Sequence, residues 1–459
     1  MSDELLTFFG EHQEITSCSA PGRLDVMGGI ADYSGSLLLQ KPIRERTTVY
    51  LARRPDNIIR VRSLTALAAN YPPEITIEVD TTWANDLPDY QNFRDKILSQ
   101  AAGDWAIYVL GCFYLLAKEK NVIFSGADVL VQSEVPFGKG VSSSAAIEVA
   151  TLMVISQVWE LKLTKLELPI LAQRVENLLV GAPCGLMDQL SSYLGEENKL
   201  LPIICQPVQV FPAIPIPEEV YFLGLDSGVK HSVSGKAYTN VRVAAFMGYT
   251  IIAMALGINQ VQITTARTTG NRDNLPFGGY LANITPAEYE SKFAPILPNT
   301  LTGREFQAQY GAIIDPVTQV VADEKYAIRA CTAHPIYENY RVEAFQGIMQ
   351  QVANSALADK NNLLKNAGAL MYASHQSYSA CGLGNAHTDE LVNMAQMAGP
   401  AAGVYGAKIT GGGSGGTVCM LALGAQGLYT VEQIRDAYAQ KYQQAIVLFN
   451  GSSPGGFYS

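Results

Sequence analysis

The sequence has few charged residues and no long hydrophobic run, and each shortage excludes a class of protein. Charged residues make up 16% of the 459 residues and hydrophobic residues 48%, which excludes a mainly disordered chain. There are 32 basic and 42 acidic residues, the opposite of the balance that is typical of nucleic-acid-binding proteins. The longest apolar run, residues 105–117, is shorter than the ~20 residues that cross a bilayer.

Cysteine and histidine are also scarce. The seven cysteines show no CxxC spacing and the five histidines are dispersed, so neither a disulfide framework nor a zinc site is expected. The N-terminal stretch MSDELLTFFGEHQEI is acidic and lacks the basic-then-apolar order of a secretory signal. We therefore expect a soluble, cytoplasmic globular protein that binds neither nucleic acid nor membrane. We expect a monomer, with a homodimer as the alternative.

The length predicts two or three domains. Residues 202–219 contain five prolines, and proline is excluded from helix interiors and central strands. This segment is therefore predicted to connect two domains, 1–215 and 216–459. Strand patterns such as 127–131 and helix patterns such as 144–159 are mixed along the chain, which indicates the α+β class.

A glycine- and serine-rich loop, VPFGKGVSSSAA at 135–146, lies between a predicted strand and a predicted helix. Gly138 and Gly140 allow a ligand to approach the backbone closely, and the N-terminus of a helix favours anions. The spacing of a Walker A loop is absent. Lys139 is either a cation near a phosphate or, more commonly at such a position, a solvated loop lysine.

Two further segments have unusual composition. The stretch KITGGGSGGT at 408–417 has five glycines within six residues, more than an ordinary turn requires. The stretch at 20–40 places Arg23, Asp25 and Asp32 among glycines and apolar residues. Charged groups in such surroundings are expected to be paired with each other or with a ligand.

Together these segments resemble the three signature motifs of the GHMP small-molecule kinases, in the order found in the galactokinase branch. Residues 181–189, GAPCGLMDQ, resemble the segment that carries the catalytic aspartate of that branch. Residues 27–40 and 329–345 are more similar to the kinase portion of the plant L-arabinokinases. The resemblance implies a two-lobed α+β fold. Its N-terminal lobe is of the ribosomal-protein-S5-domain-2-like type, its C-terminal lobe is ferredoxin-like, and the active site lies in the cleft between them.

The resemblance also implies roles for individual residues, with ATP and Mg2+ as cofactors and a small sugar as the partner. Asp188 matches the proposed general base, and Arg23 matches the arginine beside it. Trp105 matches a tryptophan that lines the adenine pocket, although packing in the core is an equally good interpretation. The residues that match the phosphate-binding loop are Gly138, Gly140, Ser142, Ser143 and Ser144. Ser144 and Glu176 match the metal ligands.

For the sugar, Asp32, Gly185 and Tyr238 match positions that contact ring hydroxyls. Galactokinases read GEHTDY where this chain reads GGIADY, so Gly29 and Ile30 replace a Glu-His pair at the C6 hydroxymethyl end. L-Arabinose has the ring configuration of D-galactose without that group. The expected activity is therefore an L-arabinokinase that forms L-arabinose 1-phosphate, with galactokinase as the alternative and a non-catalytic sugar and ATP sensor as a remote one.

Each of these assignments has a structural alternative. Arg23 and Asp188 are also explained by an ion pair without a catalytic role, and Glu176 by a solvated helix position. Tyr238 is also explained by an aromatic residue at the rim of a lobe. His334 and His375 are predicted to be packing residues.

Overall fold

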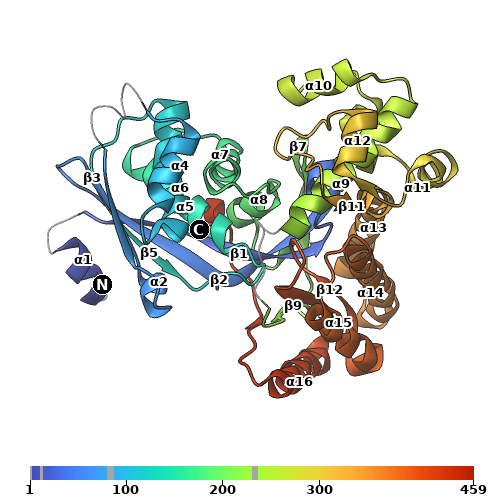
Figure 1. The fold of residues 1–459 in the computed structure, drawn as a ribbon. Helices are drawn as coiled ribbons and strands as arrows, with labels where there is room; N and C mark the ends of the chain where they lie inside the picture. Colours follow the sequence, from blue (N-terminus) through green and yellow to red (C-terminus); the bar gives the residue numbers. More distant parts are fainter. Residues whose placement is uncertain (1–2, 11–13, 80–86, 230–235) are drawn as a thin grey trace.

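Two sheets of different size organise the chain, one in each lobe (Figure 1). The computed structural model describes residues 3–10, 14–79, 87–229 and 236–459. The first sheet has the order β4-β3-β5-β2-β6-β7, with β1 paired to β2 and β8 paired to β6. Its strands are β1 (Thr16–Met27), β2 (Leu37–Arg53), β3 (Ile58–Ser63), β4 (Glu74–Glu78), β5 (Ala127–Ser133), β6 (Lys199–Cys205), β7 (Val208–Val210) and β8 (Ile214–Pro215).

Helices cover one face of this first sheet (Figure 1). They are α4 (Tyr90–Leu98), α5 (Gly103–Lys120), α6 (Ser143–Val158), α7 (Glu167–Val175) and α8 (Met187–Leu194), and a π-helical turn, Glu176–Val180, continues α7. Two short helices, α1 (Asp3–Phe9) and α2 (Leu64–Ala68), lie at the opposite face and edge. The long apolar run of the sequence is α5, which is buried on nearly all sides, as a helix apolar all round must be. Across the described ranges, no helix is both long and apolar enough to cross a membrane.

The second lobe is built on an antiparallel sheet with the order β12-β13-β9-β14. Its strands are β9 (Val220–Asp226), β12 (Val404–Ile409), β13 (Thr417–Leu423) and β14 (Leu448–Phe449). Alternate residues of β13 face opposite layers. Cys419 packs with α13 (Ile328–Asn354) and α14 (Leu357–Ala380), whereas Met420 packs with α15 (Ala386–Ala398) and α16 (Gly424–Tyr442).

A further layer of the second lobe begins with α9 (Lys236–Ala255), which packs on α13. The elements that follow it are α10 (Gln260–Thr269), α11 (Pro286–Glu288), α12 (Gly303–Tyr310) and the two-stranded ladder of β10 (Leu301–Thr302) with β11 (Lys325–Tyr326). Ile30 and Tyr33 of the first motif are buried in the core of this layer. The first motif therefore joins the two lobes.

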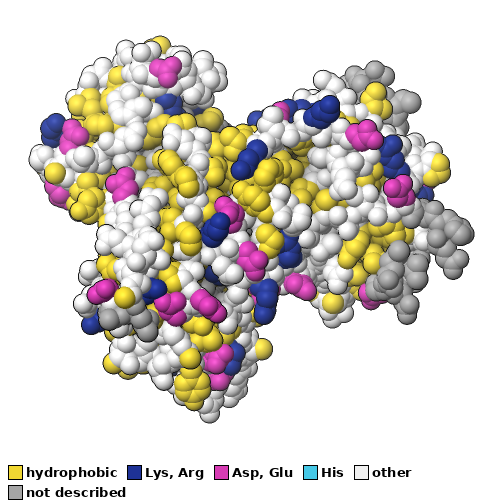
Figure 2. Space-filling model, turned by 180° about the vertical axis from the view of Figure 1, so that it is seen from behind, with side chains coloured by type: hydrophobic (Ala, Val, Ile, Leu, Met, Phe, Trp, Pro, Cys, Tyr) yellow, Lys and Arg dark blue, Asp and Glu magenta, His cyan; other side chains and the backbone are white. Residues whose placement is uncertain are grey.

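The lobes share a hydrophobic core. Leu24 and Val26 of β1 pack in one cluster with Phe222 of β9 and Val342 of α13. The C-terminus returns to the first lobe, where Phe457 makes an edge contact with the ring of Tyr193. Seen from behind, a notch separates the lobes at their upper edge, and charges of both signs are interspersed over the surface (Figure 2).

The predicted class is confirmed, and so are the elements expected at 127–131 and 144–159, which are β5 and α6. The proline-rich segment differs from the prediction because half of its residues lie in the strands β6, β7 and β8. Pro202 lies in β6 opposite Leu39 of β2, and its carbonyl accepts a hydrogen bond of 3.0 Å from Phe211 N. Proline lacks only the donor, so it is accommodated where a strand needs its acceptor. The first sheet ends at Pro215 and the second begins at Val220, which supports the division at residues 215 and 216; that division stays a prediction.

Candidate active site

Arg23 of β1 and Asp188 in the first turn of α8 form a largely buried ion pair. Arg23 donates from Nε and Nη2 to the same oxygen, Asp188 Oδ1, over 2.9 and 2.7 Å. Its Nη1 donates to the carbonyl of Gly140 over 2.7 Å. Asp188 Oδ2 makes no hydrogen bond to any residue that the structure describes. Arg23 thus links the first motif, the second motif and Asp188, and the carboxylate retains one free oxygen.

A small cavity lies beside this pair, and four segments far apart in the sequence contribute to it. It is lined by Arg23, Ile30, Asp32, Cys184, Gly185, Met187, Asp188, Tyr238, Gly411 and Gly412. Four of the five residues predicted to bind sugar are therefore brought together. The fifth, Gly29, is buried behind the wall of the cavity. His231, seven residues before Tyr238, lies outside the described residues.

Asp32 is held against the loop that precedes α8. A Cβ atom on Gly185 would lie 1.6 Å from Asp32 Oδ2, so only glycine allows this approach. Burial raises the pKa of Asp32 to about 6, although the nearby guanidinium of Arg242 acts in the opposite direction. A carboxylate at this position can accept hydrogen bonds from a polyhydroxylated ligand.

Arg242 and Asp315 are two site-forming residues that the sequence interpretation missed. Arg242 donates to both carboxylate oxygens of Asp315 over 2.8 Å, and to the carbonyl of Pro183 over 2.9 Å. This fully buried pair therefore anchors the loop that carries Gly185. Arg242 follows Tyr238 by four residues on one helix, so both lie on the same face. This spacing could have indicated from the sequence that Arg242 lies near the site.

The second and third motifs face each other where α6 begins. Gly138 and Gly140 have φ of 69° and 72°, and Ser142, the N-cap, has φ of 62°. The hydroxyl of Ser142 is buried without a hydrogen-bond partner among the described residues. Gly411 has a φ of 70°, and a Cβ there would lie 3.1 Å from the carbonyl of Gly140. These glycines bring the two loops into contact at a helix N-terminus, which is suited to an anion.

Lys139, in the same loop, forms an ion pair with a buried carboxylate, and its side chain is 26% exposed. Its ammonium lies 2.5 Å from Asp226 Oδ2, and Asp226 is fully buried. The carbonyl of Lys139 accepts a hydrogen bond of 2.8 Å from the Thr417 hydroxyl. The lysine therefore ties the second motif to the second lobe.

Ser144 and Glu176, the predicted metal ligands, are neighbours, since the Ser144 hydroxyl acts to lower the pKa of the Glu176 carboxyl. Glu176 also accepts a hydrogen bond of 2.7 Å from Gln189 Nε2. Burial raises the pKa of Glu176, and the charge of Asp188 adds to that effect. One hydroxyl and one carboxylate are donors that suit Mg2+. No cluster of three or more potential metal ligands occurs in the described part of the chain, so further ligands would come from phosphate or water.

Trp105 lies in the first turn of α5 and packs against the core of the first lobe. Its indole Nε1 donates to the carbonyl of Pro72 over 2.9 Å. Trp105 does not line the cavity described above. Its assignment to an adenine pocket stays a prediction.

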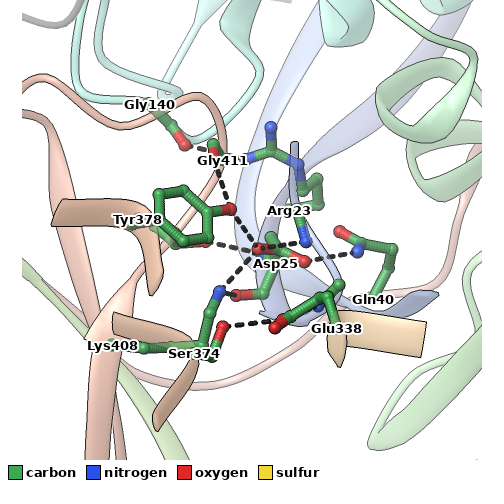
Figure 3. Close-up of polar contacts among 12 residues, drawn as sticks. Arg23, Asp25, Gln40, Gly140, Glu338, Ser374, Tyr378, Lys408 and Gly411 are labelled. Carbon is green, nitrogen blue, oxygen red and sulfur yellow. Dashed lines mark hydrogen bonds and ion pairs between the residues drawn. The ribbon is translucent and has the colours of Figure 1, made fainter. Parts of the chain in front are cut away.

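A second buried pair, Asp25 with Lys408, lies two residues from Arg23 (Figure 3). Lys408 Nζ is 2.7 Å from Asp25 Oδ2, and both side chains are fully buried. Gln40 donates to Asp25 Oδ1 over 2.8 Å, and Thr410 Oγ1 accepts a hydrogen bond of 2.6 Å from Asp25 N. The expectation that Asp25 is paired is confirmed, but its partner was not identified from the sequence.

The stretches 27–40 and 329–345 contact each other. They are the two stretches whose sequences differ from the galactokinase pattern. Glu338 Oε1 accepts hydrogen bonds from Gly28 N over 3.1 Å and from the Ser374 hydroxyl over 2.6 Å. His334 Nε2 lies 3.2 Å from the carbonyl of Gly29. His334 is thus buried, as predicted, and is also hydrogen-bonded to the first motif.

The two lobes, the glycine-rich loop before α6 and the Arg23–Asp188 pair define the class of two-lobed small-molecule kinases. Two family models match the chain: "GHMP kinases N terminal domain" at residues 107–196 and "GHMP kinases C terminal" at residues 353–444. A galactokinase of Chloroflexus aggregans is 30% identical over 88% of this chain and 82% of its own length. The chain belongs to the GHMP kinase family.

Two further similarities are informative. An L-arabinokinase of Arabidopsis thaliana is 40% identical over 97% of this chain, which spans only 46% of that relative. The crystal structure of Lactococcus lactis galactokinase complexed with galactose matches with a TM-score of 0.70 at 20% identity, over 99% of this chain and 97% of that chain. The structural match establishes the shared fold.

Proposed function

We propose that this chain is an ATP-dependent sugar 1-kinase, which transfers the γ-phosphoryl group of ATP to the anomeric hydroxyl of an aldose. The observation that carries the proposal is the free oxygen of Asp188. It belongs to a carboxylate that Arg23 holds by its other oxygen, beside a cavity next to the second motif. Membership of the GHMP kinases and the two relatives named as sugar kinases support it.

In the proposed reaction, the oxygen of the anomeric hydroxyl forms a bond to the γ-phosphorus of ATP. Asp188 Oδ2 accepts the proton that this hydroxyl loses. The bond from phosphorus to the bridging oxygen of ADP breaks in the same step. The guanidinium of Arg23 stabilises the negative charge that develops on the transferred group. Such a transfer depends mainly on positioning and charge stabilisation. The hydrogen bond from Arg23 to Gly140 serves positioning because it couples the acceptor end to the phosphate-binding loop.

The ATP phosphates are assigned to the loop before α6. The backbone N–H groups at Gly138, Gly140, Ser142 and Ser143 lie at the N-terminus of that helix, which favours anions. The buried hydroxyl of Ser142 supplies a donor that has no partner among the described residues. Ser144 and Glu176 would hold Mg2+, which when bound neutralises phosphate charge.

The proposed acceptor is L-arabinose. Asp32, Gly185 and Tyr238 line the cavity and offer contacts to ring hydroxyls, whereas Ile30 contributes an apolar surface to the same lining. A hydroxyl buried there without a partner costs roughly 1–3 kcal/mol. D-Galactose is the second candidate, because Asp32 contacts features that both sugars share and a relative is named galactokinase. The expected monomeric state and cytoplasmic location stay predictions.

The test is ADP release at saturating ATP with a panel of aldoses, including L-arabinose, D-galactose and D-glucose. We expect kcat/KM for L-arabinose to exceed that for D-galactose by roughly tenfold or more, as ~1.4 kcal/mol would give. The product should be a non-reducing sugar, because phosphorylation blocks the anomeric carbon. Equal or faster turnover of D-galactose would refute the arabinose assignment and leave a galactokinase. No ADP release with any aldose would refute the sugar 1-kinase itself.

A further inference from the structure

Tyr378 of α14 lies behind the wall of the cavity and is fully buried. Its hydroxyl donates to the carbonyl of Gly411 over 2.9 Å and lies 3.5 Å from Asp25 Oδ2 (Figure 3). Gly411 lines the cavity. Tyr378 therefore connects the third motif, at the cavity wall, to the buried Asp25–Lys408 pair.

The space that a side chain at position 29 would need is already filled. A Cβ atom on Gly29 would lie 2.0 Å from the Tyr378 hydroxyl and 2.4 Å from Asp25 Oδ2. Both distances are far below van der Waals contact, so even alanine does not fit unless both the Tyr378 hydroxyl and the Asp25 carboxylate move. The glycine at this position thus leaves no vacant room beside the cavity. Its place is taken by the hydroxyl of Tyr378.

Neighbouring groups hold this arrangement in place. Gly29 N donates to Asp25 Oδ2 over 3.2 Å, and Asp25 is fixed by Lys408. The ring of His334 packs edge-on against Tyr378 with centroids 5.4 Å apart. Burial lowers the pKa of His334 to about 4, so the imidazole is neutral at pH 7. Its Nε2–H then donates to the carbonyl of Gly29, which fixes the turn from the other side.

The next residue, Ile30, lines the cavity and has φ of 58°, a conformation that is unfavourable for a β-branched side chain. The turn at residues 29 and 30 persists because its surroundings hold it. Tyr378 thus lies behind two residues that line the cavity, Gly411 directly and Ile30 through Gly29.

We propose that Tyr378 is a specificity-determining residue of the acceptor site, which excludes an acceptor that carries a hydroxymethyl group at the part of the cavity lined by Ile30. This inference rests on the proposed sugar kinase function. The absence of polar side chains at positions 29 and 30 is one reason for preferring a pentose. Tyr378 adds a second, steric reason. Because Tyr378 acts through Gly29, Ile30 and Gly411, it is a positioning residue and not a catalytic one.

The experiment compares Tyr378→Phe, Tyr378→Ala and the unchanged chain, with kcat and KM measured separately for L-arabinose and D-galactose. Tyr249→Phe is the matched control, since Tyr249 is also buried in the second lobe and donates to a backbone carbonyl, that of Pro276, over 2.8 Å. We expect Tyr378→Ala to shift the ratio of kcat/KM toward D-galactose by roughly tenfold or more, the effect of a single methylene-sized change in a pocket. Tyr378→Phe should shift it less, and the control should leave it unchanged.

A ratio that stays unchanged in a folded Tyr378→Ala protein overturns the proposal. Failure of the unchanged chain to phosphorylate either sugar is a different result, because it removes the proposed function and the specificity with it. The packing argument has its own test in thermal unfolding. Gly29→Ala should lower the Tm strongly in the unchanged chain and less in the Tyr378→Ala background. Equal Tm losses in the two backgrounds would show that Tyr378 does not fill the space at position 29.

Discussion

Arg23 and Asp25 lie two residues apart on β1, and each forms a buried ion pair, Arg23 with Asp188 and Asp25 with Lys408. The two pairs differ in what their carboxylates can still bind. Both oxygens of the Asp25 carboxylate have partners: Gln40 donates to one, and Lys408 and Gly29 N donate to the other. Asp188 receives both hydrogen bonds from Arg23 on a single oxygen. The first pair is sealed on all sides, whereas the side chain of Asp188 is 17% exposed.

The difference supports a structural role for the first pair and the proposed catalytic role for the second. A fully buried carboxylate whose two oxygens both have partners contributes to a unique arrangement but is closed to a ligand. A carboxylate with a free oxygen at a cavity can accept a proton. Both pairs consist of a buried cation and a carboxylate, so charge does not distinguish them. They differ because one oxygen of Asp188 accepts no hydrogen bond from a described residue and its side chain is partly exposed.

The largest expected effect is on stability, at the sealed pair. Lys408→Met should lower the free energy of unfolding by about 3–5 kcal/mol, because it leaves the charge of Asp25 buried without a partner. The double variant Asp25→Asn, Lys408→Met should recover a large part of that loss. Urea unfolding measures both. Lys441→Met, at an exposed pair with Glu390, is the control and should change stability by less than about 1 kcal/mol. A Lys408→Met protein as stable as this control would contradict the sealed pair.

The next effect is on turnover, at the reactive pair. Asp188→Asn keeps shape but removes the proton acceptor, so kcat should fall by about 100-fold or more. Its Tm should fall, because the buried guanidinium of Arg23 loses its charged partner, but by less than at the sealed pair, because the side chain of Asp188 is 17% exposed. Asp25→Asn, the same chemical change at the sealed pair, should show the reverse pattern of a larger fall in Tm and a smaller loss of kcat. If a folded Asp188→Asn enzyme keeps more than about a tenth of kcat, Asp188 is not the general base.

Asp32 is a third buried carboxylate, and its titration sharpens the comparison. Its pKa is raised from 3.8 to about 6 in the folded chain, so between about pH 4 and pH 6 the folded state holds one more proton than the unfolded state. Stability attributable to Asp32 therefore falls as pH rises through this window. Asp32→Asn stays neutral and lacks this dependence. We expect the Tm of the variant, relative to the unchanged chain, to rise by a few degrees from pH 4 to pH 7. A constant difference across that range would show that Asp32 is not buried as an acid.

The smallest effect concerns the proposed metal ligands. Ser144→Ala removes one oxygen donor and should raise the Mg2+ concentration for half-maximal activity by about tenfold, the lower end of losses seen around metal sites. Ser156→Ala, on the same helix with its hydroxyl bonded to the carbonyl of Leu152, is the control. An unchanged Mg2+ titration in the Ser144→Ala enzyme would remove Ser144 from the proposed site.

Several features could be predicted from the sequence because they are local. The strand, glycine-rich loop and helix of the second motif follow from periodicity and from residues that accept positive φ. The spacing of charged residues among glycines indicated that Arg23 and Asp25 have partners. The resemblance of four motifs predicted one shared site for them, and Asp32, Tyr238 and Asp188 do line one cavity.

Tertiary structure alone decided which groups meet across the lobes. Lys408 is the partner of Asp25, Lys139 is bound to Asp226, and Tyr378 occupies the space beside Gly29. Each of these contacts joins residues far apart in the chain, and its existence depends on how two sheets share one core. The sequence does not show whether the space beside a glycine is empty or is filled by a neighbouring side chain. Only close packing in three dimensions distinguishes these cases.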